Sequence, residues 1–420
     1  MAIAHLAIRY HLDLHMKQER STIDGALARI AEREPQLQAL VPEARRRERL
    51  LADLATLPVA TSLDGLLIGV KDIFHVDGWQ TRAGSGLPPE VLTGPESGCV
   101  AQLKTAGALV LAKTVTTEFA YFEPGPTCNP HHPAHTPGGS SSGSAAAVAA
   151  GYCRLALGTQ TVGSVIRPAA FCGVVGFKPS YDRVSTTGLL YYSPAVDTVG
   201  WFTPDLAGAL AAAEILCREW RRVEALAKPV LGVPEGPFLE QASPEGLAAF
   251  ASQIRQLQAS GYMVRRVQAL ADIAEVNERH TRLISGEVAR QHEDLFRDYA
   301  DMYRPRTAAL IRDGQQISEA DIALARDGRM VLRKQLQADM AVHGIDIWIC
   351  PSALGPAPMG LETTGDPAMN LPWTHAGLPA LNLPAGCAKN ALPLGLQCIA
   401  GWQRDEELLW WGQAMAEVFN

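Results

Sequence analysis

Two serine-containing segments, both set in glycine-rich sequence, carry the residue types that acyl-transfer chemistry needs. The first segment, PGGSSSG, holds Ser140, Ser141 and Ser142, and the second, TVGSVIR, holds Ser164. Serine hydroxyls can act as nucleophiles, and bare backbone N–H groups can stabilise a developing negative charge. The small-residue run between the segments predicts a helix, and the apolar stretch after it predicts a buried strand. The pattern therefore predicts two loops that meet, the second of which carries a nucleophile.

Two lysines follow strand-like apolar runs. Lys71 ends the run Leu66 to Val70, and Lys113 ends the run Ala108 to Ala112. A lysine at the end of a buried strand either reaches solvent along its stem or stays inside with a shifted pKa. The residues alone favour the first outcome, a solvent-exposed amine.

Two other nucleophiles compete with Ser164. Gly139 to Gly143 matches the G-x-S-x-G elbow around Ser141, although the proline-broken stretch before it predicts no strand there. Cys172 is a second alternative, but it lacks a nearby histidine in the sequence, and buried cysteines are usually inert. Three histidines, at positions 131, 132 and 135, are separated by prolines without metal-ligand spacing, so no metal site is predicted.

The composition excludes several classes of protein. The net charge of −7 over 420 residues argues against nucleic acid as a partner, since phosphate binding needs a concentrated basic face. Eight cysteines without a C-x-x-C pair indicate reduced thiols, and the N-terminus lacks the basic region of a signal peptide. No uninterrupted apolar run of membrane-spanning length occurs. These features predict a cytoplasmic protein with no membrane contact.

Helical and strand-like patterns alternate along the chain, which favours an α/β fold with a sheet covered by helices on both faces. Residues 6–57 and 243–341 are predicted to be helical. Residues 169–180 predict a buried strand, and residues 346–350, 380–383 and 394–399 predict further strands.

Five separate motifs resemble those of one family, the amidase signature family. They are GVKD at 69–72, PGGSSSGSAAAVAAG at 137–151, GTQTVGSVIRPAAFCGVVGFKPS at 158–180, DPAMNLPWTHAGLPALNLPAG at 366–386 and LPLGLQCIAG at 392–401. The resemblance implies one domain over residues 1–420 built on a mixed, twisted sheet. Within it, 1–60 would be a helical lead-in, 61–205 the signature core, 243–341 a helical insert shaping the substrate pocket, and 342–420 the rest of the core.

The resemblance also implies a Ser-cisSer-Lys triad with no metal or organic cofactor. Ser164 would be the nucleophile, Ser140 the bridging serine and Lys71 the base. The backbone N–H groups of Thr161, Val162, Gly163 and Ser164 would form the oxyanion hole, with Ser141 in a supporting role. Lysine acts as a base only when neutral, so its pKa must fall from about 10.4 to near 7 through burial.

Three positions depart from the family pattern. Gln160 stands where an acid is usual, Val162 where a glycine is usual, and Ser142 where a glycine is common. Val162 would be strained if its position needed a positive φ. Arg167 and Asp197 are interpreted as structural ion-pairing groups.

The expected function is hydrolysis of a small carboxylic amide or carbamoyl-type compound, with release of ammonia or an amine. A homodimer is left open. Two alternatives remain: the A subunit of a glutamine-dependent tRNA amidotransferase, and a non-catalytic binding protein on the same fold.

Overall fold

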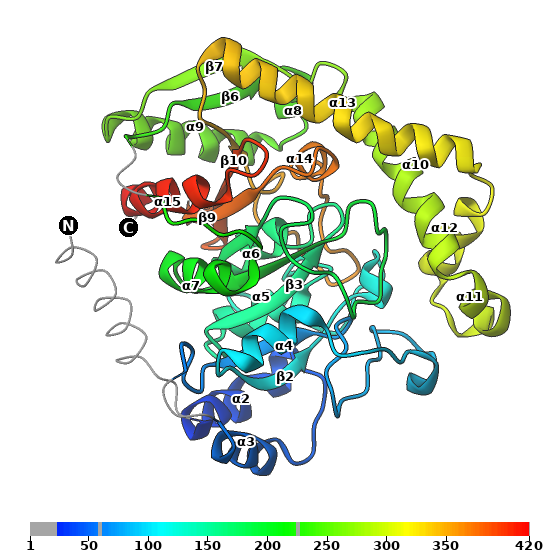
Figure 1. Cartoon of the computed structure of the whole chain (residues 1–420). Helices are drawn as coiled ribbons and strands as arrows, with labels where there is room; N and C mark the ends of the chain where they lie inside the picture. Colours follow the sequence, from blue (N-terminus) through cyan, green and yellow to red (C-terminus); the bar gives the residue numbers. More distant parts are fainter. Residues whose placement is uncertain (1–22, 58–60, 224–226, 420) are drawn as a thin grey trace.

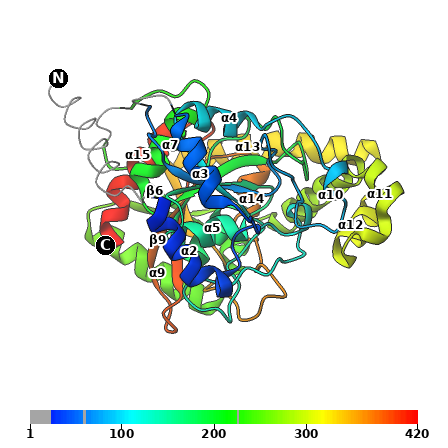
Figure 2. The same cartoon turned by 90° about the horizontal axis from the view of Figure 1, so that it is seen from below.

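The computed structural model describes residues 23–57, 61–223 and 227–419. The first 22 residues of the predicted helical lead-in lie outside this description. Its remainder forms the helices α2 (Ile23–Leu37) and α3 (Arg46–Ala55), which pack together below the β2 end of the central sheet (Figures 1 and 2).

One ten-stranded mixed sheet forms the centre of the molecule, in the order β2-β1-β3-β5-β4-β9-β10-β8-β6-β7 (Figure 1). Its strands are β1 (Leu67–Lys71), β2 (Leu109–Thr114), β3 (Leu155–Gln160), β4 (Val175–Lys178), β5 (Thr198–Thr203), β6 (Leu231–Glu235), β7 (Val264–Gln268), β8 (Ile347–Pro351), β9 (Ala380–Cys387) and β10 (Pro393–Ala400). The pairings of β1 with β2 and β3, and of β6 with β7 and β8, are parallel. The central pairings, from β3 through β5, β4, β9 and β10 to β8, are antiparallel.

Helices cover both faces of the sheet. Successive strand residues point to opposite faces, and Leu67 of β1 packs with α5 (Ser142–Ala149) and α6 (Ile166–Cys172). Its neighbour Ile68 belongs to the cluster with α4 (Gly98–Thr105), α7 (Leu206–Leu216) and α15 (Asp405–Ala416). The expected α/β architecture is therefore confirmed.

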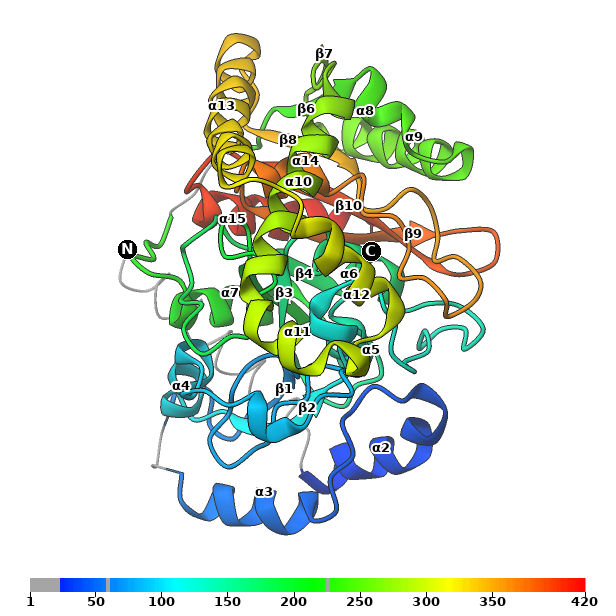
Figure 3. The same cartoon turned by 90° about the vertical axis from the view of Figure 1, so that its right-hand side faces the viewer.

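The part between β6 and β8 carries most of the remaining helices. These are α8 (Pro237–Glu240), α9 (Pro244–Ala259), α10 (Ile273–Gln291), α11 (Glu293–Tyr299), α12 (Pro305–Gly314) and α13 (Glu319–His343), with α14 (Leu371–His375) following β8. Figure 3 shows α10, α11 and α12 in front of the sheet on the side that faces the viewer. Within the described residues, no helix is both long and apolar enough to cross a membrane.

Three secondary-structure predictions need correction. Residues 243–341 are not helical throughout, because β7 lies among them as an edge strand. Residues 169–172 end the helix α6 instead of beginning a strand, and Gly173 terminates that helix with a φ of 66°. The strand β5 was not predicted, because its alternation is masked by its almost complete burial on both faces.

Buried carboxylates tie the helical part to the loop that leads to Ser140. Both carboxylate oxygens of Glu118 accept hydrogen bonds from the backbone N–H of Arg304, at 3.1 and 3.0 Å, and Glu123 accepts one from the N–H of Arg306. Both donors lie at the start of α12, where backbone N–H groups lack helical acceptors. In the same loop, the N–H of Thr117 donates to the carbonyl of Ser140. The helical part is thus fastened directly beside the candidate serine.

Candidate active site

Lys71 lies at the carboxyl end of β1 with its side chain fully buried. Its Nζ lies 2.8 Å from the Oγ of Ser140 and 2.9 Å from the Oγ1 of Thr159 on β3. The peptide bond between Gly139 and Ser140 is cis. The structure therefore brings together two of the three residues expected to form the triad.

Burial changes the protonation of Lys71. Loss of hydration lowers the pKa of Lys71 to about 7, and the nearby charge of Asp197 only partly opposes this shift. A substantial fraction of the lysine is then neutral at neutral pH, and a neutral amine has a lone pair. In that state the 2.8 Å contact can have the Ser140 hydroxyl as donor and the amine as acceptor. The solvent-exposed amine that the residues alone favoured is therefore wrong for Lys71, which is buried with a lowered pKa.

Serine side chains hydrogen bond the serine run and the start of α5 to the backbone of β3. The hydroxyl of Ser141 lies 3.3 Å from both the carbonyl and the N–H of Thr159. Ser144 donates to the carbonyl of Leu157 at 2.8 Å. Ser141 is fully buried and its hydroxyl hydrogen bonds to backbone, an environment that does not suit a nucleophile.

Ser164 lies just before α6, and its side chain is 7% exposed. No hydrogen bond joins its hydroxyl to Ser140 or to any other described residue. The two segments are linked one step away, because Arg167 of α6 donates from Nη2 to the carbonyl of Gly139 at 2.8 Å. Arg167 therefore connects the segment that carries Ser164 to the segment that carries Ser140, without a hydrogen bond from Ser164 itself.

Residues 161–164 precede α6, and their four successive backbone N–H groups have no hydrogen-bond acceptor among the described residues. The next two N–H groups, of Val165 and Ile166, both donate to the Oε1 of Gln160, at 2.8 and 2.9 Å. The four N–H groups predicted to form an oxyanion hole thus have no acceptor among the described residues.

Gln160 replaces the usual acid without loss of the loop's hydrogen bonds. An amide oxygen accepts from Val165 and Ile166, while the amide Nε2 donates to the Oγ1 of Thr374 at 2.9 Å. Thr374 in turn donates to the carbonyl of Val162 at 2.6 Å. One buried side chain therefore caps α6 and connects it to α14.

Substituting Gln160 with alanine should destabilise the protein. The change leaves two buried N–H groups without an acceptor, which should cost about 2–4 kcal/mol in the free energy of unfolding. We expect a thermal midpoint several degrees lower, measured by calorimetry. Gln160→Glu keeps the acceptor and should lose less. Gln258→Ala, at an exposed position of α9, serves as the control; an equal midpoint for all three variants would contradict this account.

Asp197 and Arg167 do not form the ion pairs predicted for them with any described residue. Asp197 accepts from the Oγ1 of Thr161 at 2.6 Å and from the N–H groups of Tyr192 and Ser193, and burial raises its pKa to about 6. Arg167 donates to backbone carbonyls and the Thr364 hydroxyl, and burial lowers its pKa to about 10. Both side chains hold loops of the site in place through hydrogen bonds, Asp197 to a hydroxyl and two backbone N–H groups and Arg167 to two backbone carbonyls and a hydroxyl.

The two competing nucleophiles lack a suitable environment. Cys172 is fully buried, burial raises the pKa of its thiol, and its Sγ lies against the carbonyl of Pro137. Ser141 has no histidine partner among the described residues. His131 and His135 each contact a backbone carbonyl at 2.8 Å, and the described residues contain no cluster of three metal-ligating side chains.

Comparison with known proteins identifies the family. The family model described as Amidase matches residues 22–409, which includes every motif discussed above. The chain belongs to the amidase family. Its fold and its relatives make this amidase an amide-hydrolysing enzyme, and the predicted family resemblance is confirmed.

The amidase is similar to two groups of proteins. The A subunit of glutamyl-tRNA(Gln) amidotransferase from Thermus thermophilus is 33% identical over 91% of this chain and 90% of its own length, and that from a Synechococcus species is 30% identical over 92% and 91%. A solved amidase structure superposes with a TM-score of 0.86 at 32% identity, covering 96% of this chain and 98% of the other. The peptide amidase of Stenotrophomonas maltophilia, at 23% identity and a TM-score of 0.77 over 94% and 93% of the two chains, shows the fold alone.

Some residues of this amidase site were not predicted from the sequence. Thr159 hydrogen bonds to Lys71, Thr374 donates to the carbonyl of Val162, and His280 donates to the carbonyl of Thr161. Thr159 could have been found, since it belongs to the strand that precedes the loop of residues 161–164. Thr374 and His280 come from distant segments, so only the folded chain brings them to the loop.

Proposed function

We propose that this amidase is a serine amidohydrolase that cleaves a small carboxylic amide or carbamoyl-type compound through an acyl-enzyme at Ser164. The observation that carries the proposal is the buried Lys71, with its lowered pKa, 2.8 Å from Ser140. A base that is neutral near pH 7 and bonded to a serine is what activation of a hydroxyl nucleophile requires.

The proposed reaction begins with proton transfer. Neutral Lys71 takes the proton of Ser140 while Ser140 takes the proton of Ser164, whose Oγ forms a bond to the substrate carbonyl carbon. The resulting oxyanion accepts hydrogen bonds from the free N–H groups of residues 161–164, and each such donor is typically worth a hundredfold or more in rate.

The tetrahedral intermediate then collapses. The C–N bond breaks, and the leaving nitrogen receives the proton from Lys71 through Ser140, so that ammonia or an amine departs and the lysine is neutral again. Water attacks the acyl-enzyme with the same lysine as base, which releases the carboxylic acid and restores Ser164. These steps need only side chains and water.

The curated relatives suggest an alternative function, that of an amidotransferase A subunit. The amidotransferase A subunits are 30–33% identical to this chain, and they work in a complex. We propose that this amidase instead works in the cytoplasm as a monomer or homodimer, with no second kind of chain. Its net charge of −7 argues against tRNA as a partner, since phosphate binding needs a concentrated basic face.

A screen of small amides with the purified protein separates these functions. Ammonia release from a simple amide without any partner supports the free hydrolase. Hydrolysis confined to glutamine, and only after addition of partner proteins, supports the amidotransferase. A folded protein that neither hydrolyses amides nor reacts with a fluorophosphonate at Ser164 would be a binding protein on this fold.

Val162 is proposed to restrict the acyl group. It lies next to Gly163 in residues 161–164, which we call the oxyanion loop. Its side chain packs in an apolar cluster with Ile166 and Tyr192, and it is not among the described residues with a positive φ. The strain considered from the sequence is therefore absent, and the extra side chain remains the relevant difference from glycine.

Val162→Gly should broaden the acyl preference, because it removes a branched side chain beside the nucleophile. We expect the ratio of kcat/KM for a long acyl amide to that for a short one to rise about tenfold, the size of effect typical of a few methylene groups in a pocket. Steady-state ammonia assays with a homologous series of amides measure this ratio. An unchanged ratio would reject a role for Val162 in selecting the acyl group.

A further inference from the structure

Two buried histidines are hydrogen bonded in series to the carbonyl of Thr161, in the loop that precedes α6. His280 comes from α10, and His375 is the last residue of α14; both side chains are fully buried. The Nδ1 atoms of the two rings lie 3.1 Å apart, and the Nε2 of His280 lies 3.1 Å from the carbonyl oxygen of Thr161. The pair thus connects the helical part of the chain to the loop that precedes Ser164.

Hydrogen-bond chemistry permits one proton arrangement for a neutral pair. A carbonyl only accepts, so the Nε2 of His280 must carry the hydrogen, and its Nδ1 must be bare. The Nδ1 of His375 must then be the donor to that bare nitrogen, which leaves the Nε2 of His375 without a hydrogen. That Nε2 is buried and has no partner among the described residues.

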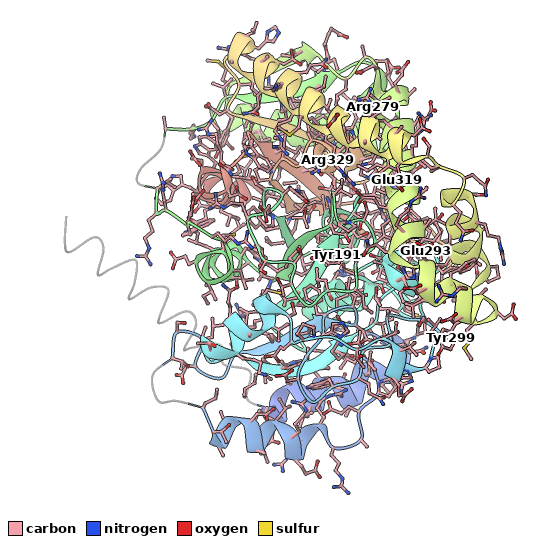
Figure 4. All side chains as sticks on the ribbon, turned by 45° about the vertical axis from the view of Figure 1, so that its right-hand side comes forward. Tyr191, Arg279, Glu293, Tyr299, Glu319 and Arg329 are labelled. Atoms are coloured by element: carbon pink, nitrogen blue, oxygen red, sulfur yellow. The ribbon has the colours of Figure 1, made fainter. Side chains whose placement is uncertain are left out.

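The surroundings keep both rings neutral. Burial lowers the pKa of His280 to about 3 and that of His375 to about 2, and Arg329 of α13 adds a nearby positive charge. Arg329, labelled in Figure 4, donates from Nε to the carbonyl of His375 at 3.1 Å. The arrangement of hydrogens is therefore fixed across the pH range in which the lysine base works.

A hydrogen bond to a backbone carbonyl also fixes the direction of the N–H group in the same peptide unit. In a planar trans peptide the C=O and the N–H point in opposite directions, so His280, by binding the Thr161 carbonyl, directs the Val162 N–H to the opposite side. Thr374, next to His375, does the same one residue later, because it binds the Val162 carbonyl and directs the Gly163 N–H. Both of these N–H groups belong to the four that have no described acceptor.

Thr161 is held on a second side. Its Oγ1 donates to the Oδ1 of Asp197 at 2.6 Å, so side chain and carbonyl are fixed by different parts of the chain. Thr161 cannot rotate its peptide toward α10 or away from it without breaking one of these buried bonds. The His280 contact is the one that determines the orientation of the Thr161–Val162 peptide plane.

We propose that His280, oriented by His375, is a positioning residue that aims the Val162 N–H at the oxyanion of the reaction. The inference rests on the proposed serine amidohydrolase function. It makes the helical part, through α10, a determinant of the oxyanion hole and not only of the substrate pocket.

Paired substitutions test this role. His280→Gln keeps a donor near the position of Nε2, and His280→Leu removes it. We expect kcat of His280→Leu to fall about 10- to 100-fold with KM within about threefold, because a misdirected donor weakens binding of the transition state more than that of the substrate. His280→Gln should retain kcat within a few-fold of wild type. The equivalent pair at the second position is His375→Asn, which keeps a donor near Nδ1, and His375→Leu.

A transition-state analogue gives a readout that general destabilisation would not move. The affinity of His280→Leu for a trifluoromethyl ketone analogue of the substrate should fall by the same factor as kcat, while its affinity for the product carboxylate changes little. Its thermal midpoint should fall by several degrees, because the Thr161 carbonyl and the Nδ1–H of His375 lose their buried partner, so affinities are measured well below that midpoint. The pH at which activity rises should stay near 7. Wild-type kcat and analogue affinity in folded His280→Leu would overturn the inference.

The failure of this inference differs from failure of the proposed function. Wild-type protein that hydrolyses amides and reacts with a fluorophosphonate at Ser164, together with an unaffected His280→Leu, would reject only the histidine role. Wild-type protein that does neither would reject the function itself. Independently of activity, ¹⁵N NMR of labelled histidines should show the hydrogen of His280 on Nε2; a hydrogen on Nδ1 alone would overturn the inference.

Discussion

Ser164→Ala is expected to reduce amide turnover by about 10⁴-fold or more, to the level of residual catalysis by the oxyanion hole and substrate binding. Alanine lacks the oxygen that forms the acyl-enzyme, and a neighbouring hydroxyl cannot replace it because Ser140 and Ser141 are buried and hydrogen bonded to Lys71 and Thr159. Steady-state ammonia release, with a coupled assay sensitive enough for the residual rate, measures the loss.

Ser142→Ala is the matched control for that loss. Ser142 belongs to the same serine run, but the one hydrogen bond of its hydroxyl to a described residue goes to the carbonyl of Val115, at 3.4 Å. Its turnover should stay within a few-fold of wild type. Retention of substantial activity by Ser164→Ala, or an equal loss in Ser142→Ala, would remove Ser164 from the role proposed for it.

Lys71 variants are expected to show the second large effect, a loss of about 10³-fold or more in kcat. In the wild type, kcat/KM should rise with pH through about 7, because only the neutral lysine accepts a proton. Lys71→Met has no base, and Lys71→Arg keeps a charge that cannot be removed at accessible pH. Both should be inactive from pH 6 to pH 9. Lys104→Met, at a surface ion pair with Glu96, is the control.

Stability against pH gives a readout of Lys71 that does not involve catalysis. Its folded-state pKa of about 7 lies below its usual 10.5, so between these values the unfolded chain binds a proton that the folded chain does not. Wild-type stability should therefore increase as pH rises through this window. In Lys71→Met that contribution is absent, and its thermal midpoint relative to wild type should decline from pH 6.5 to pH 9.5. A constant difference would mean that Lys71 is charged in the folded protein.

Local sequence patterns predicted most of the fold, because the signals were strong and close together. Apolar runs that end in Lys71 and Lys113 predicted β1 and β2, and the helical pattern predicted from residue 243 begins at α9, where the Ser243 side chain accepts from the N–H of Gly246. The missed strands were the ones without a local signal. β7 exposes charged residues because it is a sheet edge, and its pairing with β6 depends on a distant segment.

The residues of the candidate site likewise fall into those that a local motif predicted and those that it did not. Ser140, Ser164 and Lys71 belong to motifs that the resemblance could carry to this chain. The partners that orient them did not follow from any motif. His280 reaches the Thr161 carbonyl from α10, and His375 meets it from α14, so their juxtaposition depends on tertiary packing that periodicity does not encode.

Gln160, which replaces the acid that the family usually has before the oxyanion loop, preserves the local structure. An amide at Gln160 accepts the same two N–H groups that a carboxylate could accept, and it adds a donor that reaches Thr374. The substitution exchanges a buried charge for a neutral group, which avoids a desolvation cost.

The central claim is that a neutral Lys71, acting through Ser140, makes Ser164 nucleophilic. Intact-mass and peptide-mapping mass spectrometry of the folded protein after brief exposure to a fluorophosphonate tests it most directly, with the labelling rate followed from pH 5.5 to pH 9. The account predicts one adduct, on Ser164, with a rate that rises through about pH 7 and is lost in Lys71→Met. An adduct on another serine, or a labelling rate that is unchanged in Lys71→Met, would contradict it.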